Sequence, residues 1–229
     1  PPLLHPLAGR AMSGAQMVVQ AIADEGITAV FGYSGGAILP IYDAVFLYNA
    51  ERQQRAERQL PLYVPANEQG AGFMAAGYSR ATGQVGVALV TSGPGATNMV
   101  TPVRDSMADS VPMVVICGQV SRAAIGTDAF QEAPVTAIMG AVAKHVFLVT
   151  DPEKLEATIR TAFEIARSGR PGPVVVDIPK DVQNWQGVFQ GQGVLPLGVY
   201  RQRQQALGSN RLGEEAASRF FSMLQEANR

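Results

Sequence analysis

The sequence predicts an α/β protein with a doubly wound, mainly parallel six-stranded sheet and helices on both of its faces. Strand-like and helix-like segments alternate up to about residue 180, and strand–helix–strand repeats favour a parallel sheet. Two strand-like segments, 85–90 and 113–116, are almost entirely aliphatic, as in strands that helices cover on both faces. Glycine-bearing loops follow several of the strands, which is where ligands of such sheets bind.

The first helix is predicted to begin after Ser13, which can cap it in a capping box with Gln16. Gly26 is a natural residue to follow the end of this helix. A buried strand is then expected over 27–31, and it ends in the glycine-rich loop 32–36. The sequence therefore opens with a helix, a strand and a candidate ligand-binding loop.

The same alternation continues along the chain. A second helix is expected from about residue 37, and a short strand over 62–64 precedes a helix that begins at Glu68 and stops at Gly83. The later elements are strand 85–90, a helical pattern over 96–109, strand 113–116, strand 145–149, a helix that Asp151 caps with Pro152 at its first position and that Gly169 follows, and strand 174–178.

The character of the sequence changes beyond this domain. We expect an N-terminal extension at 1–12, the α/β domain at 13–182, an extended linker at 183–210 and the start of a truncated middle domain at 211–229. The linker is rich in Gln and Gly and has little periodicity. The last region is predicted to begin an amphipathic helix, because apolar residues recur at helical spacing at Leu212, Ala216, Phe220 and Leu224.

The composition excludes several classes of function. Hydrophobic residues make up 47% and charged residues 16% of the chain, which excludes a disordered protein. The net charge of −1 provides no field for nucleic acid or an anionic membrane, and no apolar run approaches the ~18–20 residues that span a bilayer. Cys117 is the only cysteine and there are two histidines, so we expect a reducing compartment and no metal site within this chain.

Glu68 and the glycine-bearing loops are the main candidates for a site. The loops 32–36, 67–72, 91–98 and 118–132 should converge, because the carboxyl ends of parallel strands share one edge of the sheet. Taken alone, glycine loops are more often tight turns than phosphate sites, and none of these matches the dinucleotide fingerprint or the P-loop. Glu68 is expected to be buried, where burial raises the pKa of a carboxyl and a helix N-terminus lowers it. Glu68 can also be read as an acidic first-turn residue that only stabilises its helix.

The resemblance of four segments to a known family favours a functional role for Glu68 over a purely helix-stabilising one. They resemble the N-terminal pyrimidine-binding domain of the large catalytic subunit of acetolactate (acetohydroxyacid) synthases, over about residues 12–185. The segments are NEQGAGFMAAGYSRATG (67–83), VTSGPGATNMVTPVRDSMADSVP (90–112), GQVSRAAIGTDAFQE (118–132) and SGRPGPVVVDIPKDVQ (168–183). The resemblance implies the thiamine-diphosphate-binding fold, and the third segment is the most particular to acetolactate synthases.

The resemblance also implies roles for individual residues. Glu68 would hydrogen-bond N1′ of the aminopyrimidine of thiamine diphosphate, so that the 4′ nitrogen can remove the thiazolium C2 proton. Gln131 would lie near the reacting carbon and Arg170 would contact FAD, a cofactor with a structural role. The residues around the pyrimidine would be Tyr33, Ser34, Gly35, Pro94 and Asn98, and those along the substrate channel Ala37, Ser121, Phe130 and Lys180.

The implied reaction decarboxylates pyruvate and joins the two-carbon unit to a second 2-ketoacid, pyruvate or 2-ketobutyrate, in branched-chain amino-acid synthesis. Mg²⁺ and FAD would need domains that these residues do not include, and the family's Gly-Asp-Gly motif does not occur in them. The active site would form between subunits of a homo-oligomer, with a small regulatory subunit as a possible partner. The fragment alone is therefore expected to be inactive, and a bacterial cytoplasm is preferred to a plastid as its compartment.

Three positions depart from the family's usual residues. Asn67 stands where His is common, Ser34 replaces the proline of the first loop, and Ser121 replaces another proline. Asn67 could still cap the helix. The departures leave two alternatives: another carboligase, such as a sulfoacetaldehyde acetyltransferase-like enzyme, against which segment 126–132 argues, or a non-catalytic stand-alone domain used for dimerisation or regulation.

Overall fold

The computed structural model describes residues 5–208 and 213–227. The chain divides into two compact units, Pro1–Leu195 and Pro196–Arg229. The first unit contains the predicted sheet, with the strands in the order β3-β2-β4-β5-β7-β6 and all neighbours parallel. Its strands are β2 (Val30–Tyr33), β3 (Leu62–Tyr63), β4 (Gly86–Val90), β5 (Met113–Gln119), β6 (His145–Leu148) and β7 (Pro173–Pro179). The predicted fold class is confirmed.

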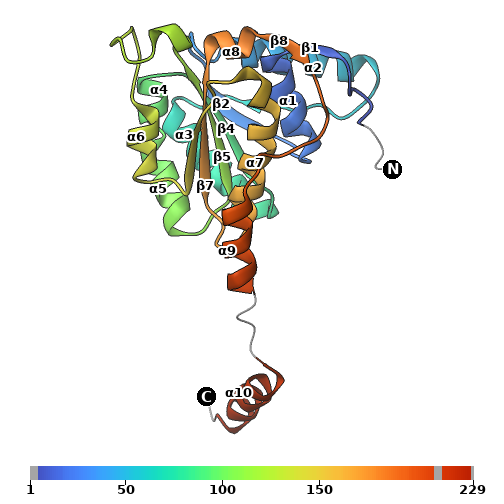
Figure 1. Cartoon of the computed structure of the whole chain (residues 1–229), viewed down its shortest axis with the longest axis vertical. Coiled ribbons are helices and arrows are strands. Elements are labelled where there is room, and N and C mark those ends of the chain that lie inside the picture. The colour runs from blue at the N-terminus through green and yellow to red at the C-terminus, as the bar shows by residue number, and fades with distance from the viewer. Residues whose placement is uncertain (1–4, 209–212, 228–229) are drawn as a thin grey trace. The chain divides into compact units, whose positions relative to one another are not determined.

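Helices cover both faces of this sheet (Figure 1). One face carries α3 (Glu68–Thr82), α4 (Pro94–Thr97), α5 (Val100–Ala108) and α6 (Val135–Gly140), and the other carries α1 (Gly14–Asp24), α2 (Leu39–Gln54) and α7 (Leu155–Arg167), with α8 (Lys180–Asn184) following β7. Two 3-10 turns, η1 (Arg122–Ala124) and η2 (Pro152–Lys154), complete the connections. The single helical pattern predicted over 96–109 is divided between α4 and α5.

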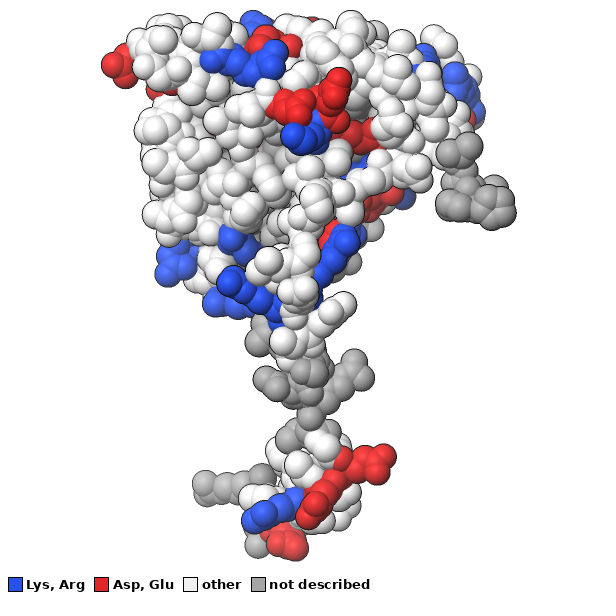
Figure 2. Space-filling view, in the orientation of Figure 1, with Lys and Arg blue, Asp and Glu red and all other residues white. Residues whose placement is uncertain are grey.

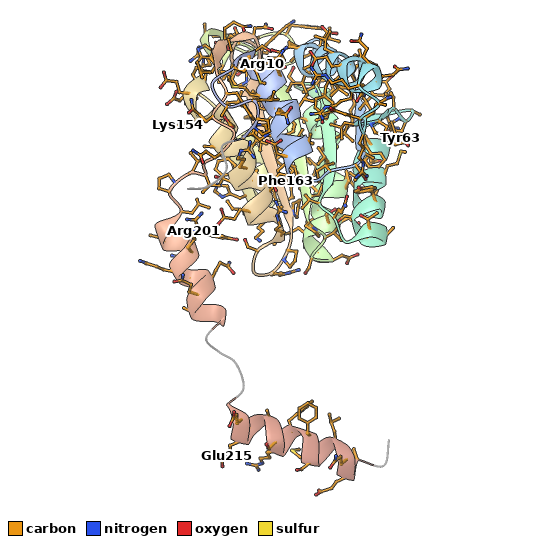
Figure 3. The ribbon with its side chains drawn as sticks, turned by 90° about the vertical axis from the view of Figure 1, so that its right-hand side faces the viewer. Arg10, Tyr63, Lys154, Phe163, Arg201 and Glu215 are labelled. Carbon is orange, nitrogen blue, oxygen red and sulfur yellow. The ribbon has the colours of Figure 1, made fainter. Side chains whose placement is uncertain are left out.

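The core lies between the central strands and the two helical layers. Every residue of β4, β5 and β7 is buried, which explains why these strands have nearly continuous aliphatic sequences. In the helical layer formed by α1, α2 and α7, Phe163 of α7 is fully buried against the sheet (Figure 3). Burying a side chain of this size contributes ~1.5–3 kcal/mol relative to leaving it in water. The central sheet is therefore the rigid base from which the strand-end loops project.

The ends of α1 and α3 follow the predicted capping chemistry. Ser13 and Gln16 form the capping box at the start of α1. At α3 the side chain of Asn67 accepts a hydrogen bond from the Gly70 N–H at 2.8 Å. The helix ends at Gly83, which has a φ of 72°, a conformation that favours glycine. The position of Glu68 at the start of α3 is thus fixed by local sequence.

Asn67→Ala is expected to destabilise the protein by about 1 kcal/mol, because the Gly70 N–H loses its acceptor at the helix N-terminus. Urea unfolding of the complete chain measures this difference. Asn67→Ser is the matched control and should retain most of the stability, since Ser is also a good N-cap. Equal loss in both variants would show that the cap is not what Asn67 contributes.

Small residues of α3 allow close packing within the chain. A Cβ added at Gly72 would lie 2.4 Å from Cγ of Pro102 in α5, and one at Gly86 would lie 2.2 Å from the carbonyl oxygen of Ala75. The outward side of α3 is different: nothing lies within 4 Å of a Cβ built at Gly77. The helix therefore uses its small residues against α5 and β4, and leaves Gly77 uncovered.

The region predicted as an extended linker, 183–210, contains regular structure. β8 (Gln186–Val188) pairs antiparallel with β1 (Ala11–Ser13), and Phe189 is fully buried against Met12 and Met17. The helix α9 (Gly198–Gly208) follows. The linker prediction is wrong for these two stretches. A three-residue strand has no periodicity to detect, and its stability comes from tertiary pairing rather than local propensity.

The second unit holds α9 and α10 (Glu214–Glu226). α10 confirms the predicted amphipathic helix, and its apolar side chains are exposed at Phe220, Phe221, Met223 and Leu224. Leu212, the first residue of that pattern, lies outside the described residues, as do 1–4, 209–211 and 228–229 of the predicted terminal regions and linker. Among the helices described, none is both long and apolar enough to span a bilayer.

Candidate functional site

Glu68 lies buried at the start of α3, facing the loop that follows β4. Glu68 as a whole is 8% exposed, and its Oε2 accepts a hydrogen bond from the Asn98 amide at 2.9 Å. Within the described part of the chain Oε1 receives no hydrogen bond, and it lies 3.5 Å from where a Cβ on Gly95 would stand. The close contact that requires glycine at that position is with Thr91, whose Cγ2 would lie 2.7 Å from the same Cβ. A buried carboxylate oxygen without a partner can accept a hydrogen bond from a ligand N–H.

The four predicted glycine-bearing loops meet at this edge of the sheet. Thr91, at the end of β4, accepts a hydrogen bond from the Ala37 N–H at 3.2 Å through its hydroxyl, and a Cβ at Gly35 would lie 2.5 Å from its Cγ2. Gly93 has a φ of 56°, and a Cβ there would lie 2.5 Å from the Gln131 carbonyl oxygen. Together with the hydrogen bond between Asn98 and Glu68, these contacts join all four loops, so the predicted convergence is confirmed.

An open hollow of about 450 Å³ lies beside these loops. It brings together Gln131 and all the residues that the sequence assigned to a substrate channel, Ala37, Ser121, Phe130 and Lys180. Ser92 also lines it, so the loop that touches Glu68 on one side borders the hollow on the other. Phe130 is 88% exposed, which leaves one wall of the hollow open to a further chain segment or ligand.

The loop that carries Phe130 and Gln131 is held by its own backbone and by Glu132. The Glu132 carboxylate accepts hydrogen bonds from the N–H groups of Gly126 and Ala129. These donors, Gly126 first, lower the pKa of Glu132. Gln131 has a φ of 57°, which is uncommon for a residue with a side chain. An unusual backbone at a residue that faces the hollow is a feature of functional loops.

An ion pair joins η1, which follows β5, to α8, which carries Lys180. Arg122 of η1 donates to Asp181 of α8 at 2.7 Å from Nε, and to the Thr150 carbonyl oxygen at 2.9 Å. This places Lys180 on the same rim as η1. The pair is about two-fifths exposed, so it orders the rim more than it stabilises the fold.

Two buried groups near the site were not predicted from the sequence. Asp177 of β7 is 2% exposed, and burial raises its pKa to about 7, while a hydrogen bond from Gln119 acts in the opposite direction. Tyr42 of α2 donates to the Leu89 carbonyl oxygen at 3.2 Å. Burial, and then the nearby Glu68 carboxylate, raise the pKa of Tyr42. An acidic residue inside the aliphatic run of β7 was the sequence signal that could have identified Asp177.

The remaining candidates lie in three different settings. Tyr33 and Ser34 are exposed at the end of β2, where Tyr33 is in register with Val90 of β4, and Pro94 is exposed as the first residue of α4. Arg170 is not part of this group. It precedes β7, at the opposite edge of the sheet, where its guanidinium donates to the carbonyl oxygens of Met107 and Ala108 and to the Ser110 hydroxyl.

Arg170→Met is expected to destabilise the first unit by about 1–2 kcal/mol, because Arg170 satisfies carbonyl oxygens at the C-terminus of α5. Thermal unfolding of the complete chain measures it. Arg58→Met removes an exposed arginine and is the control, for which no change is expected. A null effect of Arg170→Met would show that the end of α5 is adequately solvated without the guanidinium.

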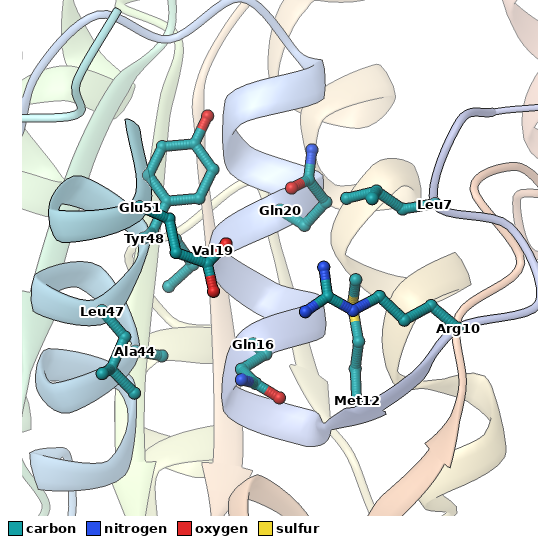
Figure 4. A pocket seen from close by; sticks show the side chains of 10 residues that line it. All are labelled: Leu7, Arg10, Met12, Gln16, Val19, Gln20, Ala44, Leu47, Tyr48 and Glu51. Atoms are coloured by element: carbon teal, nitrogen blue, oxygen red, sulfur yellow. The ribbon is translucent and has the colours of Figure 1, made fainter. Parts of the chain in front are cut away.

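A second hollow lies in the helical layer, not at the strand ends. Figure 4 shows it between α1 and α2, with Gln16, Gln20 and Arg10 on one side and Tyr48 and Glu51 on the other. It is small, about 50 Å³, and contains neither Glu68 nor a glycine-bearing loop. Figure 2 shows charges of both signs in small groups separated by uncharged surface, so the face in that view has no broad patch of one sign.

Comparison with known proteins identifies the family of this domain. Residues 12–139 match the family described as thiamine pyrophosphate enzyme, N-terminal TPP binding domain. The mitochondrial acetolactate synthase catalytic subunit of Saccharomyces cerevisiae is 52% identical over 171 residues, 75% of this chain and 24% of that protein. The acetolactate synthase isozyme 2 large subunit of Escherichia coli is 51% identical over 172 residues, 75% of this chain and 30% of that protein. The chain thus spans about a quarter to three-tenths of the length of these curated relatives.

Proposed function

The chain belongs to the thiamine pyrophosphate enzymes through their N-terminal TPP binding domain, and we propose that it is the pyrimidine-binding part of an acetolactate synthase. The full-length protein would decarboxylate pyruvate and join the two-carbon unit to a second 2-ketoacid, pyruvate or 2-ketobutyrate, for branched-chain amino-acid synthesis. The identity of about half the residues to acetolactate synthase subunits supports this reaction over other carboligations.

The single observation that carries the proposal is the buried Glu68 carboxylate, which Asn98 holds from the loop whose Ser92 lines the hollow. Oε1 of Glu68 lies near Gly95 and accepts no hydrogen bond from the described residues, so it can accept one from a flat heterocycle that presents a ring N–H. Asn98 holds the other oxygen, so the carboxylate is oriented before a ligand binds. In this proposal Glu68 holds a proton at the ring nitrogen of the aminopyrimidine. When bound, thiamine diphosphate supplies the electron sink on which a 2-ketoacid can lose carbon dioxide.

The hollow is proposed to hold the 2-ketoacid. Gln131 offers an amide beside the reacting atoms, and the Lys180 ammonium can attract the substrate carboxylate. Ala37 and Phe130 provide apolar surface to the hollow, and Phe130, which is exposed in this chain, would limit access of water once a further segment or a ligand covers it. The residues nearer the pyrimidine would be Tyr33, Ser34, Gly35, Pro94 and Asn98. Among them, Gly35 packs closely against Thr91 and Asn98 donates a hydrogen bond to Glu68.

Subunit association is part of the proposal. The outward face of α3, next to Glu68, exposes Phe73 and Met74, which are 42% and 40% accessible. Apolar side chains beside an incomplete site support a homo-oligomer whose active site lies between subunits. The relatives are named as large or catalytic subunits, which supports a small regulatory partner. A bacterial cytoplasm remains the proposed compartment; the relatives include bacterial and mitochondrial proteins.

Mg²⁺ and FAD are proposed as further cofactors of the full-length protein. Among residues 5–208 and 213–227, no group of three or more His, Cys, Asp or Glu side chains could hold a metal ion. A contact of Arg170 with FAD would require it to release some of its hydrogen bonds to the end of α5. We propose that other segments of the full-length protein provide most of both sites, and that the 229 residues alone are inactive.

The test is acetolactate formation from pyruvate by the full-length protein with thiamine diphosphate, Mg²⁺ and FAD. Turnover that depends on thiamine diphosphate would support the proposal. Binding of the cofactor without acetolactate would contradict it. Acetyl transfer from sulfoacetaldehyde would then identify the other carboligase, and failure with both substrates would favour a non-catalytic domain.

A further inference from the structure

Gln119 and Asp177 form a buried polar pair next to the hollow. Gln119 is the last residue of β5 and Asp177 lies in the adjacent strand β7. The Gln119 amide donates from Nε2 to Oδ2 of Asp177 at 2.9 Å. The two residues are 3% and 2% exposed, yet Gln119 lines the hollow. The pair therefore connects the sheet core with the proposed substrate-binding surface.

The Gln119 amide also connects the two loops that border the hollow. Nε2 donates to the Ala133 carbonyl oxygen at 3.2 Å, and Oε1 accepts from the Val120 N–H at 2.8 Å. Val120 directly precedes Ser121, and Ala133 lies two residues after Gln131. One side chain thus holds the backbone beside both of these residues, and the acceptor that orients it is Asp177.

Asp177 is an unfavourable residue for purely structural reasons. Its Oδ1 has no hydrogen-bond partner within the described residues, and its neighbours along β7 are Val176 and Ile178. A buried carboxyl with an unsatisfied oxygen destabilises a fold, and a neutral side chain would avoid that penalty. Carboxyls with strongly raised pKa values are common at functional sites. Asp177 contacts Gln119, which lines the hollow.

We propose that Asp177 and Gln119 are positioning residues of the active site. Asp177 fixes the orientation of the Gln119 amide, and the amide fixes the separation between segments 119–121 and 131–133. This separation sets the positions of Ser121 and Gln131, which both line the hollow. Neither Asp177 nor Gln119 needs to touch the substrate. The consequence for catalysis rests on the proposed function, whereas the consequence for the loops does not.

The first experiment measures amide hydrogen exchange of residues 119–133 in the complete 229-residue chain. Asp177→Leu removes the acceptor, and Asp177→Asn retains one, so the two variants form a matched pair of similar size. We expect at least tenfold faster exchange in segment 119–133 of the Leu variant and near-wild-type exchange in the Asn variant. Ser106→Ala is the control, because Ser106 is fully buried in α5 with an unpartnered hydroxyl and should leave this segment unchanged.

Wild-type exchange in the Leu variant would overturn the proposal. If that variant does not fold, Gln119→Met removes the amide while keeping a side chain of similar length. It should loosen the same segment, and unchanged protection in Gln119→Met would overturn the proposal equally.

The second experiment measures steady-state kinetics of the same variants in the full-length protein. Asp177→Leu should lower kcat for acetolactate formation at least tenfold with a smaller change in KM for pyruvate, and Asp177→Asn should restore most of it. Equal kcat in both variants would overturn the catalytic part of the proposal. A wild-type protein that makes no acetolactate, while its loops respond as expected, would instead overturn the proposed function alone.

Discussion

Glu68→Gln in the full-length protein is expected to lower the rate of acetolactate formation about 100-fold or more, the scale of a lost acid–base group. Glutamine has nearly the same shape as glutamate, and its carbonyl oxygen can still accept the hydrogen bond from Asn98. The second carboxylate oxygen, Oε1, would become an NH₂ group. This group donates where the carboxylate accepts, so it cannot hold a ring N–H of the pyrimidine. The loss should therefore arise at the cofactor and not in the fold.

The measurement is kcat for pyruvate at saturating thiamine diphosphate, together with the unfolding temperature of the variant. Glu51→Gln is the control, since Glu51 is an exposed carboxylate of α2 on the wall of the separate small hollow. It should retain wild-type activity. Activity of Glu68→Gln within a few-fold of wild type would contradict the role of Glu68, and it would favour the reading in which this acidic residue only stabilises the start of α3.

The fold could be predicted because its determinants are local and repeated. Ser13, Gln16 and Gly83 specify helix ends through interactions within a few residues, and the aliphatic runs of β4 and β5 identify strands covered on both faces. β8 could not be predicted in the same way. Its pairing partner β1 lies far away in the chain, and its burial of Phe189 depends on that pairing.

The site could be predicted to the extent that it follows from strand direction. Once the strands are parallel, the loops after β2, β3, β4 and β5 must share an edge, so the meeting of Glu68 with Asn98 and of Gly93 with Gln131 follows from topology. The roles of individual residues came from the resemblance and remain proposals. The acidic residue within an aliphatic strand was a signal for Asp177, but its role could not be predicted, because that role depends on Gln119, the side chain that it contacts.

The departures from the family's usual residues are structurally mild at α3. Asn67 caps the helix through the Gly70 N–H, so replacement of the usual His leaves the backbone that carries Glu68 in place. Ser34 lies in an exposed loop, while its neighbour Gly35 keeps close contact with Thr91. The backbone that carries Glu68 is therefore compatible with the proposed catalytic role, and the Glu68→Gln measurement decides between that role and a non-catalytic domain.

Asp177→Asn is expected to change the pH dependence of stability more than any other single substitution considered for this chain. Burial raises the pKa of Asp177 to about 7 from 3.8, so between these values the folded state holds a proton that the unfolded state has released. Stability then falls as pH rises through this window and is constant above it. A difference of about three pH units corresponds to roughly 4 kcal/mol. The neutral Asn side chain removes this dependence.

The measurement is the free energy of urea unfolding for both proteins at pH 4 and pH 8. The stability of Asp177→Asn relative to wild type should rise by roughly 4 kcal/mol between the two pH values. Any penalty for an unpaired Asn N–H is present at both and cancels. Carboxyls with lowered pKa values, such as Glu132, stabilise the fold at higher pH in both proteins, so they cancel as well. If the stability difference between Asp177→Asn and wild type is the same at both pH values, Asp177 is ionised throughout this range. Water or an internal rearrangement would then satisfy Oδ1, and the charge of Asp177 would not destabilise the fold.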